Sequence, residues 1–201
     1  MTRGEGGPGR RRWGPDPAAK GRRLFIAVPL PDAAVQAVAS IVDEVRAMDL
    51  PAGARDVRWV RLDGLHLTIR FLGPTPDDRV ASLDGPIELE LAGSGTFPSG
   101  RRPRVLWIGV EGATDALARL AAAIETALTA SGWEPSERAF RAHLTLARSD
   151  GIAVADRVAS RLAAGMADRR IEAPIDRIGL FESITGGGPA RYLPVAIRNF
   201  A

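Results

Sequence analysis

A four-residue segment occurs twice in this chain of 201 residues, as HLTI at 66–69 and as HLTL at 143–146. Each copy ends the same series: an apolar run, a segment with helical periodicity, and then the His-containing segment. The two series comprise residues 23–30, 31–48 and 65–72 in the first half and 104–110, 113–132 and 142–148 in the second. This repeat predicts two similar strand–helix–strand half-units, which is a strong restriction on the fold.

The remaining segments add strands and short helices to these half-units. The residue pattern predicts strands at 56–60 and 87–93, a strand pair at 173–183 and 190–197, and helices at 77–83 and 154–165. Strands joined by short connections, with helices between them, favour an α+β fold. We expect a bilobal molecule, with two mainly antiparallel sheets related by a pseudo-two-fold axis around a central cleft and helices on the outer faces.

Residues 1–22 differ in composition from the rest of the chain. They are rich in Gly, Pro and Arg and nearly lack aliphatic residues, which predicts a disordered, solvated tail ahead of one bilobal domain at 23–201. They hold five Arg and one Lys against two acidic residues, a net charge of +4, whereas the whole chain carries +3. The folded part therefore sums to about −1, so any recognition of phosphate there must be local.

Several classes of protein are excluded or disfavoured. The chain has no cysteine, which excludes disulfides, thiolate catalysis and Cys-ligated metals. It contains no GxxxxGK[ST] loop and no GxSxG elbow. Neither Asp63 nor Asp150, the carboxylates near the histidines, has a spacing typical of metal ligands, so we expect no metal and no cofactor. No apolar run approaches the roughly 18 residues that span a membrane, and no secretory signal is present. We expect a cytoplasmic monomer.

The two histidine segments place polar side chains on one face of a strand. Since residues i and i+2 share a face, His66, Thr68 and Arg70 point one way and the aliphatic residues between them point into a core. In the second segment His143 and Thr145 share a face. Two such strands side by side would bring two imidazoles and two hydroxyls into one small volume.

That set of side chains suits chemistry at a phosphodiester. One histidine alone is more often structural, but its repetition in matching contexts points to function. Displacement at phosphorus needs a base for the attacking water and an acid for the leaving oxygen, and imidazole can serve as either near neutral pH. Hydroxyl groups and an arginine can stabilise the charge on the non-bridging oxygens.

At these residues the sequence resembles the two-histidine phosphoesterases, which carry a pair of His-x-[Thr/Ser] motifs. It is most similar to the bacterial and archaeal RNA 2′,3′-cyclic phosphodiesterases, formerly called 2′-5′ RNA ligases. The resemblance covers about residues 23–197 and is carried by RLFIAVPLP, VRWVRLDGLHLTIRFLG, RPRVLWIGV, FRAHLTLARSD and IGLFES…RYLPVA.

The resemblance implies a bilobal α+β fold with a central cleft and a role in RNA processing. It implies metal-independent hydrolysis of an RNA terminal 2′,3′-cyclic phosphate to a 2′-phosphate. The family's catalytic residues map onto His66 and His143, and its phosphate-binding residues onto Thr68, Thr145 and Arg148. By analogy His143 would be the base and His66 the acid, and the reverse assignment stays open.

The family pattern and strict strand alternation disagree about arginine. Alternation puts Arg148 on the face opposite His143 and favours Arg70, whereas the family pattern favours Arg148. A bulge or turn at the strand end could bring Arg148 round, so we prefer it and keep Arg70 as the second candidate. Two other functions stay open: a non-catalytic RNA-end binder on the same scaffold, and a phosphodiesterase for small cyclic nucleotides.

Overall fold

The computed structural model describes residues 22–48, 52–75, 87–186 and 188–200. The nine strands in these ranges are β1 Arg22–Pro29, β2 Arg58–Trp59, β3 His66–Thr75, β4 Leu89–Phe97, β5 Val105–Gly112, β6 His143–Arg148, β7 Arg170–Glu172, β8 Arg177–Ile184 and β9 Arg191–Asn199. The three α-helices there are α1 Asp32–Ala47, α2 Thr114–Ala130 and α3 Val154–Met166. Short 3₁₀ turns, η1 Ala54–Asp56 and η2 Leu62–Gly64, flank β2.

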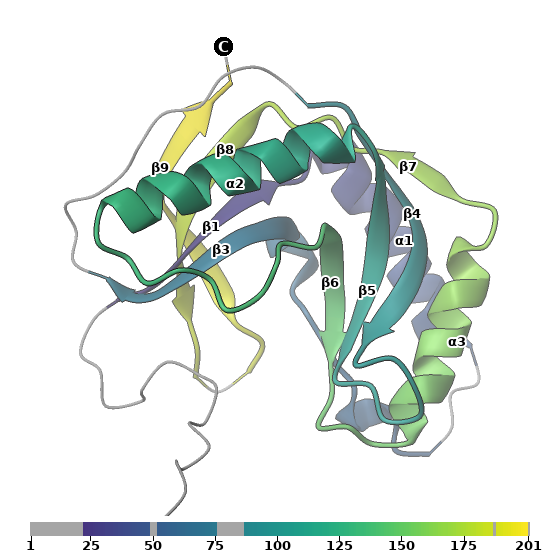
Figure 1. The fold of residues 1–201 in the computed structure, drawn as a ribbon. Coiled ribbons are helices and arrows are strands. Elements are labelled where there is room, and N and C mark those ends of the chain that lie inside the picture. Colours follow the sequence, from purple (N-terminus) through teal and green to yellow (C-terminus); the bar gives the residue numbers. More distant parts are fainter. Residues whose placement is uncertain (1–21, 49–51, 76–86, 187, 201) are drawn as a thin grey trace, which may run out of the picture.

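The strands form two antiparallel sheets, one of four strands and one of five (Figure 1). The first has the order β3-β1-β8-β9 and the second the order β2-β6-β5-β4-β7. In each, the histidine strand pairs with the apolar strand that begins its own half, β3 with β1 and β6 with β5. Apart from β2, the two orders are equivalent, which confirms the predicted α+β fold of two related antiparallel sheets.

The crossover helices are exchanged between the halves. α1 follows β1 of the first sheet, yet it contacts α3 and β7, and α3 in turn packs on β4 of the second sheet. α2 follows β5 of the second sheet, yet it contacts β3 of the first. In Figure 1 α2 crosses the strands of the first sheet, while α1 and α3 lie beside those of the second. Buried residues from both halves therefore form one hydrophobic cluster.

The sequence of α1 explains where this helix begins and which of its faces is buried. α1 begins after Pro31 and has an acidic residue in its first turn, where the helix dipole favours negative charge. Its buried residues recur at helical spacing and are Ala34, Val38, Ile41, Val42 and Val45.

In the described part of the chain, no helix combines the length and apolar character needed to cross a membrane.

Several element boundaries differ from the sequence prediction: β4 ends four residues later than expected, and β8 begins four residues later. The strand expected at 56–60 is reduced to β2, because η1 occupies the preceding residues. β3, which is an edge strand, continues through Pro74 to Thr75, and edge strands are where sheets tolerate proline. The three-residue β7 was not predicted, and β1 begins at Arg22, within the expected tail. Residues 1–21 and the helix expected at 77–83 lie outside the described residues.

Candidate active site

A β-bulge in β6 determines which residues share the face of His143. Thr145 lies opposite Trp107 and Ala147 lies opposite Leu106, which is the neighbouring residue in β5. Leu146 therefore has no partner and is an extra residue in the ladder. Leu146 and Ala147 are both buried, whereas Thr145 is half-buried and Arg148 is exposed. The bulge thus shifts the alternation by one residue and turns Arg148 to the side of His143 and Thr145. Strict alternation was therefore wrong for Arg148, and the bulge at Leu146 is the physical reason.

β3 carries the same bulge at the same position of its motif. Thr68 lies opposite Ala27 and Arg70 lies opposite Ile26, the neighbouring residue in β1. Ile69 is therefore the extra residue. The aliphatic residue that ends each four-residue repeat is therefore the bulge residue. The position equivalent to Arg148 in β3 is Phe71, which is 57% exposed.

Arg70 is consequently turned away from the histidine. Its Nε lies 3.0 Å from Oε2 of Glu125 on α2, and its Nη2 donates to the carbonyl of Glu134 at 2.6 Å. Glu125 neutralises the charge of Arg70. Through these two contacts, Arg70 links β3 to α2 and to the segment before β6. The prediction that Arg70 shares the face of His66 is wrong, and the bulge at Ile69 is the physical reason.

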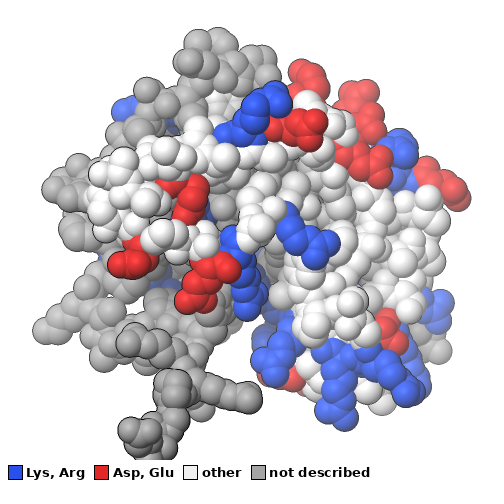
Figure 2. Space-filling model, in the orientation of Figure 1, with Lys and Arg blue, Asp and Glu red and all other residues white. Residues whose placement is uncertain are grey.

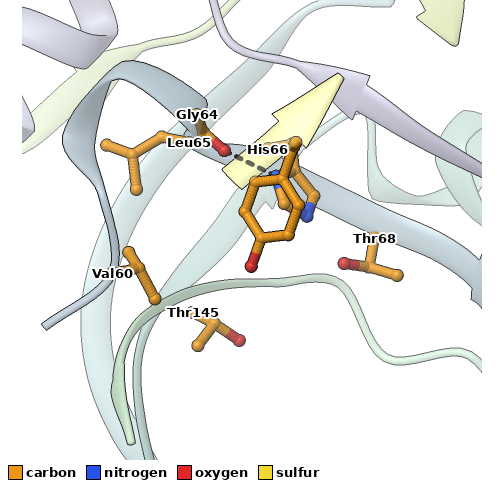
Figure 3. Close-up of a pocket in the computed structure, with 7 residues that line it drawn as sticks. Val60, Gly64, Leu65, His66, Thr68 and Thr145 are labelled. Carbon is orange, nitrogen blue, oxygen red and sulfur yellow. Dashed lines mark hydrogen bonds between the residues drawn. The ribbon is translucent and has the colours of Figure 1, made fainter. Parts of the chain in front are cut away.

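Side chains from both sheets line one pocket (Figure 3). Its volume is about 280 Å³, counted with the solvent-filled mouth, and its lining residues are Val60, Gly64, Leu65, His66, Thr68, Thr145 and Tyr192. β3 and β6 belong to different sheets but contact each other. The structure therefore brings three of the five predicted site residues to one pocket. His143 and Arg148 are not among the lining residues.

The imidazole of His66 is fixed by a short hydrogen bond and by aromatic packing. Its Nδ1 lies 2.6 Å from the carbonyl oxygen of Gly64, two residues earlier, as Figure 3 shows. Because a carbonyl only accepts, Nδ1 carries the proton and Nε2 is left free to accept or donate one. The ring of Phe25 lies 4.9 Å away and that of Tyr192 4.8 Å away, between centroids.

His143 repeats this arrangement in the second half. Its Nδ1 lies 2.7 Å from the carbonyl oxygen of Arg141, again two residues earlier. The rings of Phe97 and Trp107 pack at 5.0 and 6.4 Å between centroids. Both histidines therefore have the same tautomer imposed by the same local bond, with Nε2 available for chemistry.

Burial lowers the pKa of both imidazoles below the ordinary value of 6.5. The hydrogen bonds to Gly64 and Arg141 act in the opposite direction, since they favour the protonated ring. The positive charge of Arg148 lowers the pKa of His66 and of His143, and that of Arg141 lowers the pKa of His143. Since one guanidinium influences both rings, Arg148 lies within electrostatic range of each.

A pH titration followed by NMR should therefore give two histidine midpoints, both below 6.5. The chain has only two histidines, so the His66→Gln variant assigns both Hε1 signals. The unfolded chain binds more protons between each folded pKa and 6.5, so thermal stability should fall as the pH drops through that window. A midpoint above 6.5 for either ring would contradict this account.

The carboxylates nearest to the histidines in sequence are engaged with arginines. Asp63 accepts from Nε of Arg61 at 3.0 Å, and Asp150 accepts two bonds from Arg58 at 3.0 and 2.8 Å. Within the residues that the structure describes, no three His, Asp or Glu side chains converge as a metal site would require.

Sequence reasoning missed Tyr192 and Phe71. Tyr192, the chain's single tyrosine, lines the pocket from β9, and burial raises the pKa of its hydroxyl while the charge of Arg148 opposes that shift. Its position depends on β9 pairing with β8 at the far side of the first sheet, which no local pattern reveals. Phe71 could have been found only by placing the bulge.

Comparison with known proteins gives a consistent picture. The family model described as the 2′-5′ RNA ligase superfamily matches residues 29–187. A relative from Aeropyrum pernix, named RNA 2′,3′-cyclic phosphodiesterase, is 36% identical over 103 residues, which cover 47% of this chain and 58% of the relative. A relative of the same name from Archaeoglobus fulgidus is 32% identical over 134 residues, covering 63% and 72%.

The solved structures show the same fold. E. coli LigT complexed with 3′-AMP superposes with a TM-score of 0.64 at 24% identity, covering 90% of this chain and 99% of LigT. At this identity the likeness concerns the fold alone, and it agrees with the paired sheets described above. The family-model match includes both His-Leu-Thr segments and most of the chain, so this protein belongs to the 2′-5′ RNA ligase superfamily.

Proposed function

We propose that the protein hydrolyses the 2′,3′-cyclic phosphate at RNA ends to a 2′-phosphomonoester, without a metal ion, by acid–base catalysis with His66 and His143. One observation carries this: two imidazoles, each fixed through Nδ1 to the carbonyl two residues earlier, lie on contacting strands with Nε2 free. The relatives named RNA 2′,3′-cyclic phosphodiesterase support the same reaction.

In the proposed mechanism Nε2 of neutral His143 takes a proton from water, whose oxygen attacks the phosphorus. The bond from phosphorus to the 3′ oxygen breaks, and protonated His66 gives its Nε2 proton to that oxygen. The phosphate stays on the 2′ oxygen, and one water is consumed. The negative charge of the bound phosphate favours the protonated ring and so opposes the lowering of its pKa by burial. The same geometry permits the two histidines to exchange roles.

Thr68, Thr145 and Arg148 are the proposed phosphate ligands. The two hydroxyls belong to the pocket that His66 lines, so they can donate to the non-bridging oxygens. The guanidinium of Arg148 can neutralise the charge that grows on those oxygens in the transition state. Its charge lowers the pKa of both imidazoles, which supports a position near both rings.

End-group analysis tests the reaction directly. An oligoribonucleotide ending in a 2′,3′-cyclic phosphate is incubated with the protein in excess EDTA, and the product is examined by mass spectrometry and ³¹P NMR. We expect the gain of one water and a 2′-phosphate, at the same rate with and without EDTA. A 3′-phosphate product, or activity abolished by EDTA and restored by a divalent metal, contradicts the proposal.

A second candidate is a phosphodiesterase for small cyclic nucleotides, favoured by the net charge of about −1 on the residues after 22, which gives no broadly basic surface for a long RNA. Competition between a cyclic mononucleotide and the oligonucleotide distinguishes the two. Substrate recovered unchanged but bound would instead indicate a non-catalytic RNA-end binder. We further propose that residues 22–201 act as one monomeric, cytoplasmic unit preceded by a tail, and size-exclusion chromatography with light scattering tests the oligomeric state.

A further inference from the structure

Five arginines gather at one end of the second sheet, and we call this group the arginine edge. Its members are Arg58, Arg101, Arg102, Arg104 and Arg148, all of them exposed. Arg58 is paired with Asp150 through both guanidinium branches. The other four make no ion pair within the part of the chain that the structure describes, so the edge presents several uncompensated positive charges.

Strand register explains why these charges lie together. In the second sheet β2, β6 and β5 are neighbours, and Arg148 of β6 lies opposite Arg58 on one side and Val105 on the other. Arg104 directly precedes Val105. Adjacent strands are about 4.8 Å apart, so the backbones that carry Arg58, Arg148 and Arg104 lie close together at this end of the sheet. The charge of Arg104 reaches Asp150, whose pKa is lowered first by its bonds to Arg58.

The loop that carries Arg101 and Arg102 is held firmly against the end of β6. Ser149, next to Arg148, is only 5% exposed, and its Oγ donates to the carbonyl of Pro103 at 2.5 Å. Its backbone N–H donates to the carbonyl of Arg104 at 3.0 Å. These two hydrogen bonds join the loop to the end of the histidine strand, so Arg104 and Arg148 lie at the same junction.

This gathering is not a consequence of overall composition. The residues after 22 sum to about −1, because the tail alone carries more positive charge than the whole chain. Figure 2 shows basic side chains grouped at the lower right, where the β4–β5 loop and the end of β6 lie in Figure 1, and acidic side chains mainly elsewhere on this face. On this face, basic side chains are therefore more frequent near the end of β6 than elsewhere.

From this placement we propose that the arginine edge binds the backbone phosphates of the nucleotides that precede the cyclic end of a single-stranded RNA, an inference that rests on the proposed function. Arginine forks match phosphate oxygens in charge and geometry. With the terminal phosphate at Arg148, the preceding phosphates lie near Arg104, Arg102 and Arg101. An oligonucleotide is then the preferred substrate, because a mononucleotide has no preceding phosphates to make these contacts.

The test compares two double variants with the same change in charge. Arg101→Gln/Arg102→Gln alters the arginine edge, whereas Arg119→Gln/Arg198→Gln removes two exposed arginines from α2 and β9, which lie at the opposite end of Figure 1 from the β4–β5 loop. KM and kcat are measured for a cyclic-phosphate decaribonucleotide and for a 2′,3′-cyclic mononucleotide over a range of salt concentrations. Binding of a fluorescent decaribonucleotide ending in 2′-phosphate is followed by anisotropy under the same conditions.

In the edge variant we expect the salt slope for oligonucleotide binding to become less negative by about 0.7 for each lost contact, which is roughly a fivefold loss of affinity per contact at 0.1 M salt. Hydrolysis of the mononucleotide by the edge variant should stay unchanged, and so should oligonucleotide binding and hydrolysis by the Arg119/Arg198 variant. An unchanged slope, or an equal loss with the mononucleotide, overturns the inference. The anisotropy arm needs no turnover, so failure of the proposed hydrolysis would leave this result readable.

Discussion

Replacing His66 or His143 by asparagine is expected to lower kcat for the cyclic phosphate by about 10²- to 10⁴-fold, the usual contribution of a general acid or base. Asparagine keeps an N–H donor near the position of Nδ1, so the bonds to the carbonyls of Gly64 and Arg141 can persist. It has no group at the position of Nε2. The loss would therefore report the missing proton transfer rather than a disturbed strand.

The matched controls are the glutamine variants and the double variant. Glutamine extends to the position of Nε2 but cannot take up a proton there, so it should be as inactive as asparagine. Because the two histidines act on one transition state, the double variant should lose much less than the product of the single losses. Circular dichroism and thermal unfolding check the fold. A kcat within tenfold of wild type in either asparagine variant would refute the paired mechanism.

The pH profile of the residual activity assigns the roles. A base must be deprotonated, so the rate rises with pH through its pKa, and an acid must be protonated, so the rate falls through its own. The variant that lacks the base should lose the rising limb, and the variant that lacks the acid should lose the falling limb. Since the pKa of each free ring is lowered by burial, the wild-type maximum of kcat/KM should lie below pH 6.5.

The sequence predicted the paired sheets and the histidine strands because both depend on local patterns. A repeated strand–helix–strand series limits the topology, and alternation puts His66 with Thr68 and His143 with Thr145. The structure places Thr68 and Thr145 in one pocket, as that reasoning requires. The exchange of α1 and α2 between the sheets was not predicted, since an amphipathic helix shows which of its faces is buried but not which sheet covers it.

The errors come from features that only pairing between strands defines. Arg70 was placed on the wrong face because one extra residue at Ile69 shifts the alternation of every later residue by one position. The same irregularity at Leu146 brings Arg148 to the histidine face, and alternation alone pointed the other way. An aliphatic residue at a bulge looks like any other aliphatic strand residue, so nothing in its type marks the change.

Arg148 should be the most important residue after the histidines, and the Arg148→Ala variant is expected to lose about 10²- to 10³-fold in kcat/KM. Removal of one preorganised donor to transition-state charge typically costs this much. Arg148→Lys keeps the charge but loses the two-pronged donor, so it should fall between alanine and wild type. The measurement is steady-state hydrolysis of the cyclic-phosphate oligonucleotide at several pH values.

The same substitution should change the acid–base behaviour of both histidines. The charge of Arg148 lowers the pKa of His66 and of His143, so its removal should raise both NMR midpoints and move the pH–rate maximum upward. Arg141→Ala is the matched control, because the charge of Arg141 acts on His143 but its removal leaves the backbone carbonyl in place. One midpoint should move in the Arg141 variant and two in the Arg148 variant. If Arg148→Ala moves only one midpoint, or neither, its guanidinium does not lie near both rings.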